Sequence, residues 1–190
     1  MTPDSALHGW GLLPLITPQT YAVWQIGLPE ADLRRALHGK WRNRLVKAEA
    51  QVKPVVLSER NLRHLIATEA SQRRDRAYKN LPGDIALDWP GGVVAMGWHS
   101  GGALQAGMVF LIHGRAASYF LGWASPLARA VFAHGPILWQ AMRKLRDRGV
   151  VTLDLGAIDS EIGASLARFK LGTGAGLMAA GTTCLVVPMP

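Results

Sequence analysis

Hydrophobic and polar residues follow two different periods along this chain. Alternation at every second residue, or a short continuous apolar run, is typical of strands, whereas apolar positions three and four apart are typical of helices. By these criteria the predicted strands are 21–28, 52–57, 93–99, 104–113, 116–123, 150–155 and 182–187. Turn residues at 100–102 and 114–115 join the three middle strands into an antiparallel meander.

Helical spacing predicts helices between these strands. They cover 29–50, 59–78, 135–149 and one short amphipathic turn around 166–169. Ser58 is a suitable N-cap for the second helix, and Pro136 stands at the start of the third. Strands and helices mixed in this way predict an α+β (α/β-like) fold in which helices flank one sheet.

Length and composition predict one domain. A chain of 190 residues with 49% hydrophobic content can bury a single core. Residues 1–18 contain several turn formers and little periodicity, so we expect an irregular lead-in followed by one domain over 19–190. No apolar run approaches the roughly 18 residues that cross a bilayer, and the only cysteine, Cys184, has no partner for an internal disulfide. We therefore expect a cytoplasmic protein without a transmembrane segment.

The charge of the chain points to its ligands more than to its fold. The net charge is +8, and the lysines and arginines concentrate in 34–79 and 143–148. A polyanionic ligand such as tRNA, coenzyme A, a nucleotide-sugar or a lipid headgroup suits this distribution, whereas we expect no DNA partner. An ordinary basic surface explains the composition equally well. The six histidines have no metal-ligand spacing, so no metal site is expected.

The first predicted helix has an apolar face and a basic border. Its core-facing positions are Leu33, Leu37, Trp41, Leu45 and Ala48. Lys40, Arg44 and Lys47 form one stripe beside that face, because they follow the i, i+4, i+7 spacing of a helix. Arginine grips phosphate through two parallel hydrogen bonds, so this stripe is a candidate site for a phosphorylated ligand. A solvated helix whose long side chains cover apolar surface is the alternative.

The segment 153–176, LDLGAIDSEIGASLARFKLGTGAG, combines the parts of a site for a negatively charged group. A short buried strand is followed by an acidic loop, a cationic helix end and a glycine-rich stretch. Buried strands rarely place an aspartate such as Asp154 in their interior unless something pairs with it. Asp154 is thus either part of a site or a partner in a structural hydrogen bond to a neighbouring strand or loop.

Four segments of the chain resemble Fem-type proteins, the peptidoglycan interpeptide-bridge aminoacyltransferases, and the single-domain acyltransferases grouped with them. The similar segments are LDLGAID with the following LARFKLG run, LRRALHGKWRNRLVKA at 33–48, ATEASQR at 67–73 and AGMVFLIHGRAASYFLG at 106–122. They occur in the family's order and span about residues 20–187. The resemblance implies a GNAT-like fold, with a mainly antiparallel mixed sheet, and transfer of an acyl or aminoacyl group from an activated carrier to an amine.

The resemblance also implies roles for particular residues. Phe169 and Lys170 match the family's phenylalanine–lysine pair, which places Phe169 at the substrate and suggests that Lys170 stabilises negative charge developing on the donor. Asp154 and Asp159 are candidates for binding the incoming ammonium and accepting its proton, with Asp154 the stronger of the two because its strand ends at the site.

Two further positions have both a functional and a structural interpretation. Arg73 lines a substrate groove according to the resemblance, whereas its spacing from Glu69 fits an exposed ion pair on one helix. His134 and Gly135 open the third long helix, where free backbone amides can bind an anion and His134 can act as a general base. A histidine that caps the helix or packs at its entry is the alternative.

Together these features predict an acyltransferase of the N-acetyltransferase-like or aminoacyl type. The expected donor is acyl-CoA or aminoacyl-tRNA, with no tightly bound cofactor, and the expected acceptor is a small-molecule or peptide amine. Bridge-forming Fem enzymes usually have two such domains, so a homodimer can supply the second, with Trp24, Trp89, Trp98 and Trp123 as candidate surface residues. The alternative functions are a non-catalytic RNA-binding module and a basic membrane-surface module.

Overall fold

The computed structural model describes residues 12–16, 18–78, 80–159, 163–181 and 183–186. The strands in this part of the chain are β1 (Leu12–Ile16), β2 (Thr20–Gln25), β3 (Val55–Val56), β4 (Val93–Ser100), β5 (Ala103–His113), β6 (Ala116–Ala124), β7 (Thr152–Ala157), β8 (Gly176–Ala179) and β9 (Thr183–Val186). The α-helices are α1 (Glu30–Ala36), α2 (Gly39–Glu49), α3 (Glu59–Asp75), α4 (Pro126–Ala130), α5 (His134–Arg146) and α6 (Ala164–Leu171), and Gly83–Ala86 forms a 3₁₀ turn.

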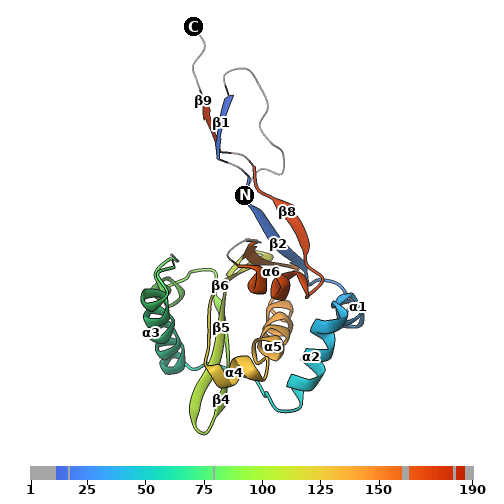
Figure 1. Cartoon of the computed structure of the whole chain (residues 1–190), viewed down its shortest axis with the longest axis vertical. Helices are drawn as coiled ribbons and strands as arrows, with labels where there is room; N and C mark the ends of the chain where they lie inside the picture. Colours follow the sequence, from blue (N-terminus) through green and yellow to red (C-terminus); the bar gives the residue numbers. More distant parts are fainter. Residues whose placement is uncertain (1–11, 17, 79, 160–162, 182, 187–190) are drawn as a thin grey trace.

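A seven-stranded sheet organises the described residues in the order β3-β4-β5-β6-β7-β2-β8. The neighbouring strands pair antiparallel, except that β6 and β7 run parallel. Helix α3 covers one face of the sheet, and α2 and α5 lie on the other (Figure 1). This arrangement confirms the predicted α+β fold with a mainly antiparallel sheet flanked by helices.

Each face of the sheet has its own apolar core. Under α5 and α2 the core includes large side chains such as Trp24, Phe110 and Trp139, all 2% exposed or less. Under α3 a smaller core contains Leu65, Val109 and Leu121. The predicted core face of the first helical region is confirmed, because all five of its residues are at most 5% exposed. Burial of this apolar surface is the main stabilising term of the fold.

The first helical region is nevertheless two helices, and the prediction of one continuous helix is wrong. Leu37 and His38 have extended backbone (ψ 134° and 138°), and α2 restarts at Gly39. The backbone amide of His38 donates to the carbonyl of Gly172 at 2.9 Å, outside the helix. The hydrogen bond from His38 to Gly172 and the low helix propensity of Gly39 thus interrupt the helix, although the apolar periodicity continues across this point.

Several boundaries also differ from the prediction. Strand β3 has two residues where six were expected, and α3 ends at Asp75 rather than near Tyr78. Ser58 caps α3 as predicted, since its hydroxyl accepts from the amide of Asn61 at 3.4 Å. The short helix α4 was not predicted, because its five residues contain no full apolar repeat.

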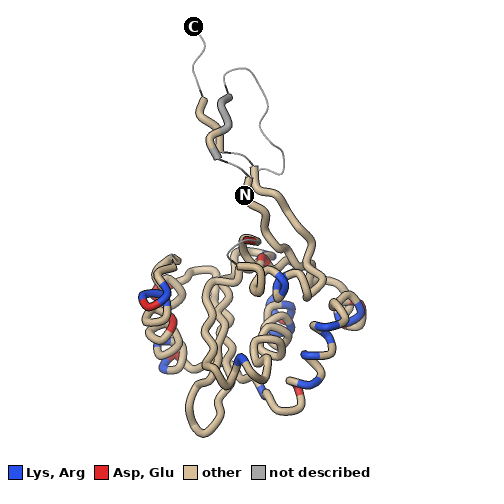
Figure 2. Tube along the Cα trace, in the orientation of Figure 1, with Lys and Arg blue, Asp and Glu red and all other residues tan. Residues whose placement is uncertain are grey.

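An uncharged two-stranded arm extends from the sheet. Strand β1 pairs antiparallel with β9 and projects beyond β2 and β8 (Figure 1). The expected irregular lead-in is therefore wrong for residues 12–16, which form a strand. Strand β8 was not predicted, and it begins at Gly176, the last residue of the predicted glycine-rich stretch. The sequence has no Asp, Glu, Lys or Arg over 5–29 or 171–190, so the charge of +8 belongs to the remainder of the chain, as the colours of Figure 2 show for the described residues.

Candidate functional site

The parallel strands β6 and β7 separate after a short contact. Their paired residues are Ala116 with Thr152, Ala117 with Leu153 and Ser118 with Asp154. Beyond that point β6 continues to Ala124 and β7 to Ala157 without further pairing between them. Phe120 forms a bulge, since its neighbours pair with adjacent residues of β5, and a bulge bends a strand and increases its twist. We call the diverging segments, 118–124 and 154–157, the fork.

Lys170 on α6 is the buried cation of the fork. Only 6% of the residue is exposed, and its Nζ donates to the carbonyl oxygen of Ala157 at 2.8 Å. Gly156 leaves room for this ammonium, because a Cβ atom there would lie 3.3 Å from Nζ, and its φ of +87° suits glycine. Removal from water lowers the pKa of Lys170, and the nearby carboxylate of Asp154 partly opposes this shift.

Asp154 lies on β7 beside Lys170, as the sequence pattern predicted for two parts of one site. Its Oδ1 accepts a hydrogen bond from the backbone amide of Gly156 at 2.7 Å. This bond lies within β7 itself, whereas the alternative that we considered was a structural hydrogen bond to a neighbouring strand or loop. One carboxylate oxygen thus shapes the end of β7, while the charge of the group acts on Lys170. Its role in catalysis stays a prediction.

Phe169 belongs to an aromatic cluster with Trp41 and Phe132. The ring centroids of Phe169 lie 5.9 Å from Trp41 and 5.8 Å from Phe132, and Trp41 and Phe132 are 5.7 Å apart. Phe132 has a φ of +56°, which is uncommon for a residue with a side chain. The cluster joins α2, the turn before α5 and α6, so it fixes the helix that carries Lys170. Phe169 thus has a packing role whether or not it meets a substrate.

His134 stands at the start of α5 and faces both the aromatic cluster and β6. Its ring centroid is 6.4 Å from that of Phe169, and its Nε2 lies 3.1 Å from the carbonyl oxygen of Trp123. Because a carbonyl can only accept, this contact assigns the proton to Nε2 and leaves Nδ1 as the basic nitrogen. Burial lowers the pKa of His134. A neutral histidine of this kind can act as a base, and it also fits the packing role.

Gly135 is the residue that the packing of Phe132 against the first turn of α5 requires. A Cβ atom at this position would lie 2.6 Å from the ring of Phe132, closer than side chains tolerate. The glycine therefore allows Phe132 to pack against the first turn of α5. We predicted Gly135 for anion binding, and the structure gives it this steric role, which leaves the anion-binding prediction untested.

The three predicted site cations of α2, Lys40, Arg44 and Lys47, are exposed and differ in their surroundings. Arg44 contacts the aromatic cluster, because its guanidinium carbon lies 5.8 Å from the centroid of Phe132. Lys40 and Lys47 are on the same helix, and for these two side chains the described residues provide no hydrogen bond or ion pair. Figure 2 shows the basic positions following one another along α2. A chain of side-chain contacts through Phe132 and Phe169 thus connects Arg44 with α6.

Arg73 holds the loop that follows α3. Its Nη1 donates to the carbonyl oxygens of Asn80 and Leu81 at 3.0 and 2.9 Å. The predicted exposed ion pair with Glu69 is wrong, because Glu69 is 1% exposed and accepts instead from the hydroxyl of Tyr78 at 2.9 Å. Asp159 is exposed after β7, next to residues 160–162, which lie outside the described part of the chain.

A buried polar group that the sequence interpretation missed lies near the bulge. One oxygen of Glu69, Oε2, is buried and has no hydrogen-bond partner among the residues that the structure describes. Tyr119, next to the bulge, lies close enough to Glu69 and Tyr78 that their charges add to the effect of burial, which raises the Tyr119 pKa above its usual range. Helical spacing contains the signal for Glu69, because it continues the arc of Leu65 and Ile66. No comparable signal marks the bulge at Phe120 beside Tyr119.

No group of histidine, cysteine, aspartate and glutamate in the described residues has the arrangement of a metal site. Among the described helices, none is long and apolar enough to cross a membrane.

Comparison with solved structures identifies the fold. No family model and no curated protein matches this chain. FemX superposes with a TM-score of 0.74 at 12% identity, covering 90% of this chain and 62% of FemX. The C-terminal domain of a putative lysylphosphatidylglycerol synthetase from Agrobacterium fabrum gives 0.58 at 16% identity over 90% of this chain and 60% of that one. A putative GNAT-family acetyltransferase from Novosphingobium aromaticivorans gives 0.52 at 14% over 94% and 71%.

The fold is therefore Fem-type and GNAT-like, as the resemblance implied. The chain spans about three fifths of the length of the first two of these structures, 62% and 60%. The names of the synthetase domain and of the acetyltransferase denote the synthesis of lysylphosphatidylglycerol and the transfer of acetyl groups. At this level of identity the likeness shows the fold alone.

Proposed function

We propose that this protein is an acyltransferase that moves an acyl or aminoacyl group from an anionic carrier to an amine, with the fork as the site of transfer. The observation that supports this most is the buried ammonium of Lys170, held by Ala157 beside Asp154 where β6 and β7 diverge. A desolvated cation next to a carboxylate is an arrangement that active sites use to handle developing charge. The GNAT-like fold adds support at the level of reaction class.

The reaction forms a bond between the amine nitrogen and the carbonyl carbon of the donor. The carbonyl oxygen becomes negatively charged in the tetrahedral intermediate, and Lys170 Nζ is the group proposed to stabilise it. The bond from the carbon to the carrier oxygen or sulfur then breaks, and the carrier leaves with the electron pair. Asp154, with His134 as a second candidate, accepts the proton that the amine loses, and that proton finally balances the charge of the leaving carrier.

The donor is proposed to be acyl-CoA or aminoacyl-tRNA, bound as a substrate rather than as a resident cofactor. Arg44 supports this choice, because it projects from α2 over Phe132 and so borders the cluster that leads to Lys170. Lys40 and Lys47 extend the same positive surface. Both donors contain phosphate groups, which such cations bind. A small-molecule or peptide amine is the proposed acceptor, and the cytoplasm is the proposed compartment.

A homodimer remains part of the proposal, although two of its four candidate tryptophans are excluded as surface residues. Trp24 is 2% exposed and Trp98 is 8% exposed, so both belong to the core. Trp89 and Trp123 are partly buried against the core under α3.

Labelled donors offered separately with a mixture of amines would test the proposal. The donors are acetyl-CoA, a long-chain acyl-CoA and charged tRNA, and the readout is label recovered as an acid-stable amide. We expect one donor class to react, with loss of transfer in Lys170→Met and weaker donor binding in Lys40→Gln/Arg44→Gln. Binding of RNA or of anionic vesicles without any transfer would contradict the proposal and favour a non-catalytic module.

A further inference from the structure

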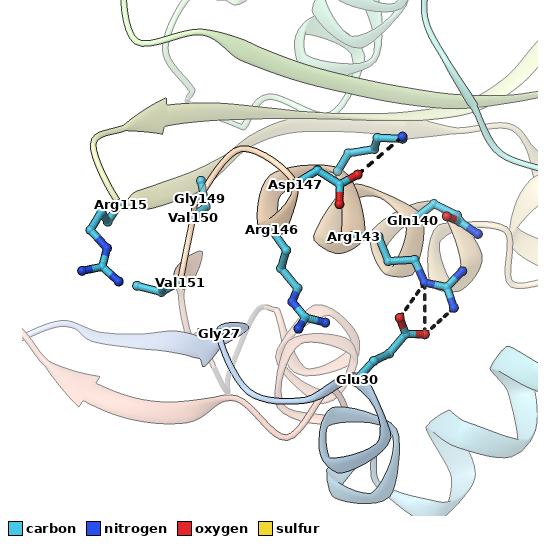
Figure 3. A pocket seen from close by; sticks show the side chains of 11 residues that line it. Gly27, Glu30, Arg115, Gln140, Arg143, Arg146, Asp147, Gly149, Val150 and Val151 are labelled. Atoms are coloured by element: carbon cyan, nitrogen blue, oxygen red, sulfur yellow. Dashed lines mark hydrogen bonds and ion pairs between the residues drawn. The ribbon is translucent and has the colours of Figure 1, made fainter.

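A hollow of about 720 Å³ lies at the end of α5 that is remote from the fork (Figure 3). Its walls are the last turns of α5, the segment 149–151 that leads into β7, Arg115 in the turn between β5 and β6, and Gly27 with Glu30 near α1. We call it the arginine hollow. Since α5 has 13 residues, its last turn at the hollow lies about 20 Å from its first turn, where His134 stands near the fork. It is therefore a separate place on the molecule.

The charges that line the arginine hollow do not balance. Its cations are Arg115, Arg143, Lys144 and Arg146, and its carboxylates are Glu30 and Asp147. Arg143 pairs with Glu30, with its Nε 3.0 Å from Oε1, and Lys144 lies 3.6 Å from Asp147. Arg115 and Arg146 are left over, and neither guanidinium has a hydrogen bond or ion pair within the described part of the chain. The surplus is two positive charges.

The two surplus arginines border the hollow from different elements. Arg115 projects from the turn between β5 and β6 and Arg146 from the last turn of α5, and in Figure 3 Gly27 and Val151 lie between the two side chains. The pKa of Glu30 is lowered mainly by Arg143, and the charge of Arg146 makes a smaller contribution in the same direction. An anion between two cations removes their repulsion, and guanidinium groups bind phosphate through paired hydrogen bonds.

Compensation of the helix dipole explains only part of this arrangement. Cations in the last turn of a helix are favourable, which accounts for Arg146 together with Arg143 and Lys144. Arg115 is outside any helix and has no dipole to offset. The volume also exceeds what a single ion fills and falls within the ~300–1,000 Å³ typical of small-molecule sites.

We propose that the arginine hollow binds a phosphomonoester of nucleotide size, with its dianionic phosphate between Arg115 and Arg146. The two charges of the phosphate match the surplus of the hollow. The partly exposed side chain of Val151 offers an apolar contact to the group attached to the phosphate, and the side chain of Gln140 supplies a further polar contact. This inference does not rest on the proposed transfer reaction, because it uses no residue of the fork.

Calorimetry with AMP, adenosine and inorganic phosphate would test the inference on the full chain. We expect AMP to bind, adenosine to show no binding, and inorganic phosphate to bind more weakly than AMP. The double variant Arg115→Gln/Arg146→Gln should lose about 100-fold in AMP affinity, about tenfold for each charged hydrogen-bonding group. Arg60→Gln/Arg74→Gln is the matched control, since it removes two exposed arginines from α3 on the other face of the sheet.

Three results would overturn this inference. The first is equal AMP affinity in the two double variants, and the second is no binding of AMP at millimolar concentration. The third is binding of a short RNA without binding of AMP, which would make the hollow an RNA contact instead. Both variants change exposed or half-buried side chains, and urea unfolding of each would verify that the fold persists. Failure of transfer at the fork would leave each of these readouts unchanged.

Discussion

The positive charges near the two ends of α5 differ in how far they are exposed to water. At its first turn, near the fork, the cation Lys170 is buried and desolvated, and its ammonium donates to the backbone carbonyl of Ala157. At its last turn the cations are numerous and more exposed, and they pair with carboxylates that are also near solvent. Burial changes the pKa of Lys170, whereas water screens the pairs at the other end. The density of positive charge therefore does not locate the candidate site, because Lys170, whose pKa burial lowers, is away from the cluster of cations at the last turn of α5.

The largest effect on stability is expected from the aromatic cluster at the fork end. Trp41→Ala should lower the free energy of unfolding by about 3–5 kcal/mol, because it removes a side chain that is 5% exposed and contacts Phe132 and Phe169. Arg146→Ala at the other end should change it by less than about 0.5 kcal/mol. Urea unfolding measures both. Similar losses in the two variants would break the contrast between the two ends.

Lys170→Met should separate activity from stability. We expect transfer to fall by about 100- to 1,000-fold, the usual loss of a group that stabilises an oxyanion, while the unfolding free energy stays within about 1 kcal/mol of the parent. Stability is preserved because the variant loses one hydrogen bond and also the cost of burying an ammonium. Lys53→Met, on the exposed surface after α2, should leave transfer unchanged.

The pH dependence of transfer should identify the protonated form of Lys170 as the active one. Its pKa is lowered from the ordinary value of 10.5 by desolvation, so the ammonium is lost at a lower pH than in a free lysine. Transfer should therefore decline as pH rises through that lowered pKa. A profile that rises over the same alkaline range and is absent in Lys170→Met would instead show that the neutral amine is required.

His134 should make stability depend on acid. Burial lowers its folded pKa below the ordinary 6.5, so the unfolded chain binds the proton first as pH falls. The stability contribution is complete above about pH 6.5 and is lost as pH drops toward the folded pKa. His134→Gln should flatten the curve in this window, whereas His113→Gln, at an exposed position, should not. Equal curves for His134→Gln and the parent would contradict the assignment.

The smallest effect is expected from the ion pair between α1 and α5. Glu30 and Arg143 have side chains that are 40% and 41% exposed, so water screens their attraction. A double-mutant cycle with Glu30→Gln and Arg143→Gln should give a coupling below about 1 kcal/mol. A coupling several times larger would show that this end of α5 is as poorly hydrated as the fork.

The local pattern of apolar and polar residues predicted most of the sheet and the helices, because the buried residues recur at the regular spacing of a strand or a helix. The meander of β4, β5 and β6 and the cap at Ser58 are examples, since alternation, turn glycines and a short polar side chain act within a few residues. The break at His38 was not predictable in this way, because its cause is a hydrogen bond to Gly172, far away in the sequence.

The candidate site shows the same division. The segment 153–176 predicted that Asp154 and Lys170 belong together, and the structure places them within electrostatic reach. It did not predict that Glu69 is buried under Tyr78, because the nearby Arg73 offered an ion pair that local spacing favours. The arginine hollow was not predicted from the sequence either, because Arg115 in a β-turn and Arg146 at a helix end are brought together only by the fold.

Hydrogen–deuterium exchange with the reactive donor would test the central claim most directly. If the fork is the transfer site, the donor should protect peptides that cover 118–124, the first turn of α5 and 154–158, and leave 143–151 unchanged. Protection confined to 143–151, or protection at the fork that is undiminished in Lys40→Gln/Arg44→Gln, would contradict the account.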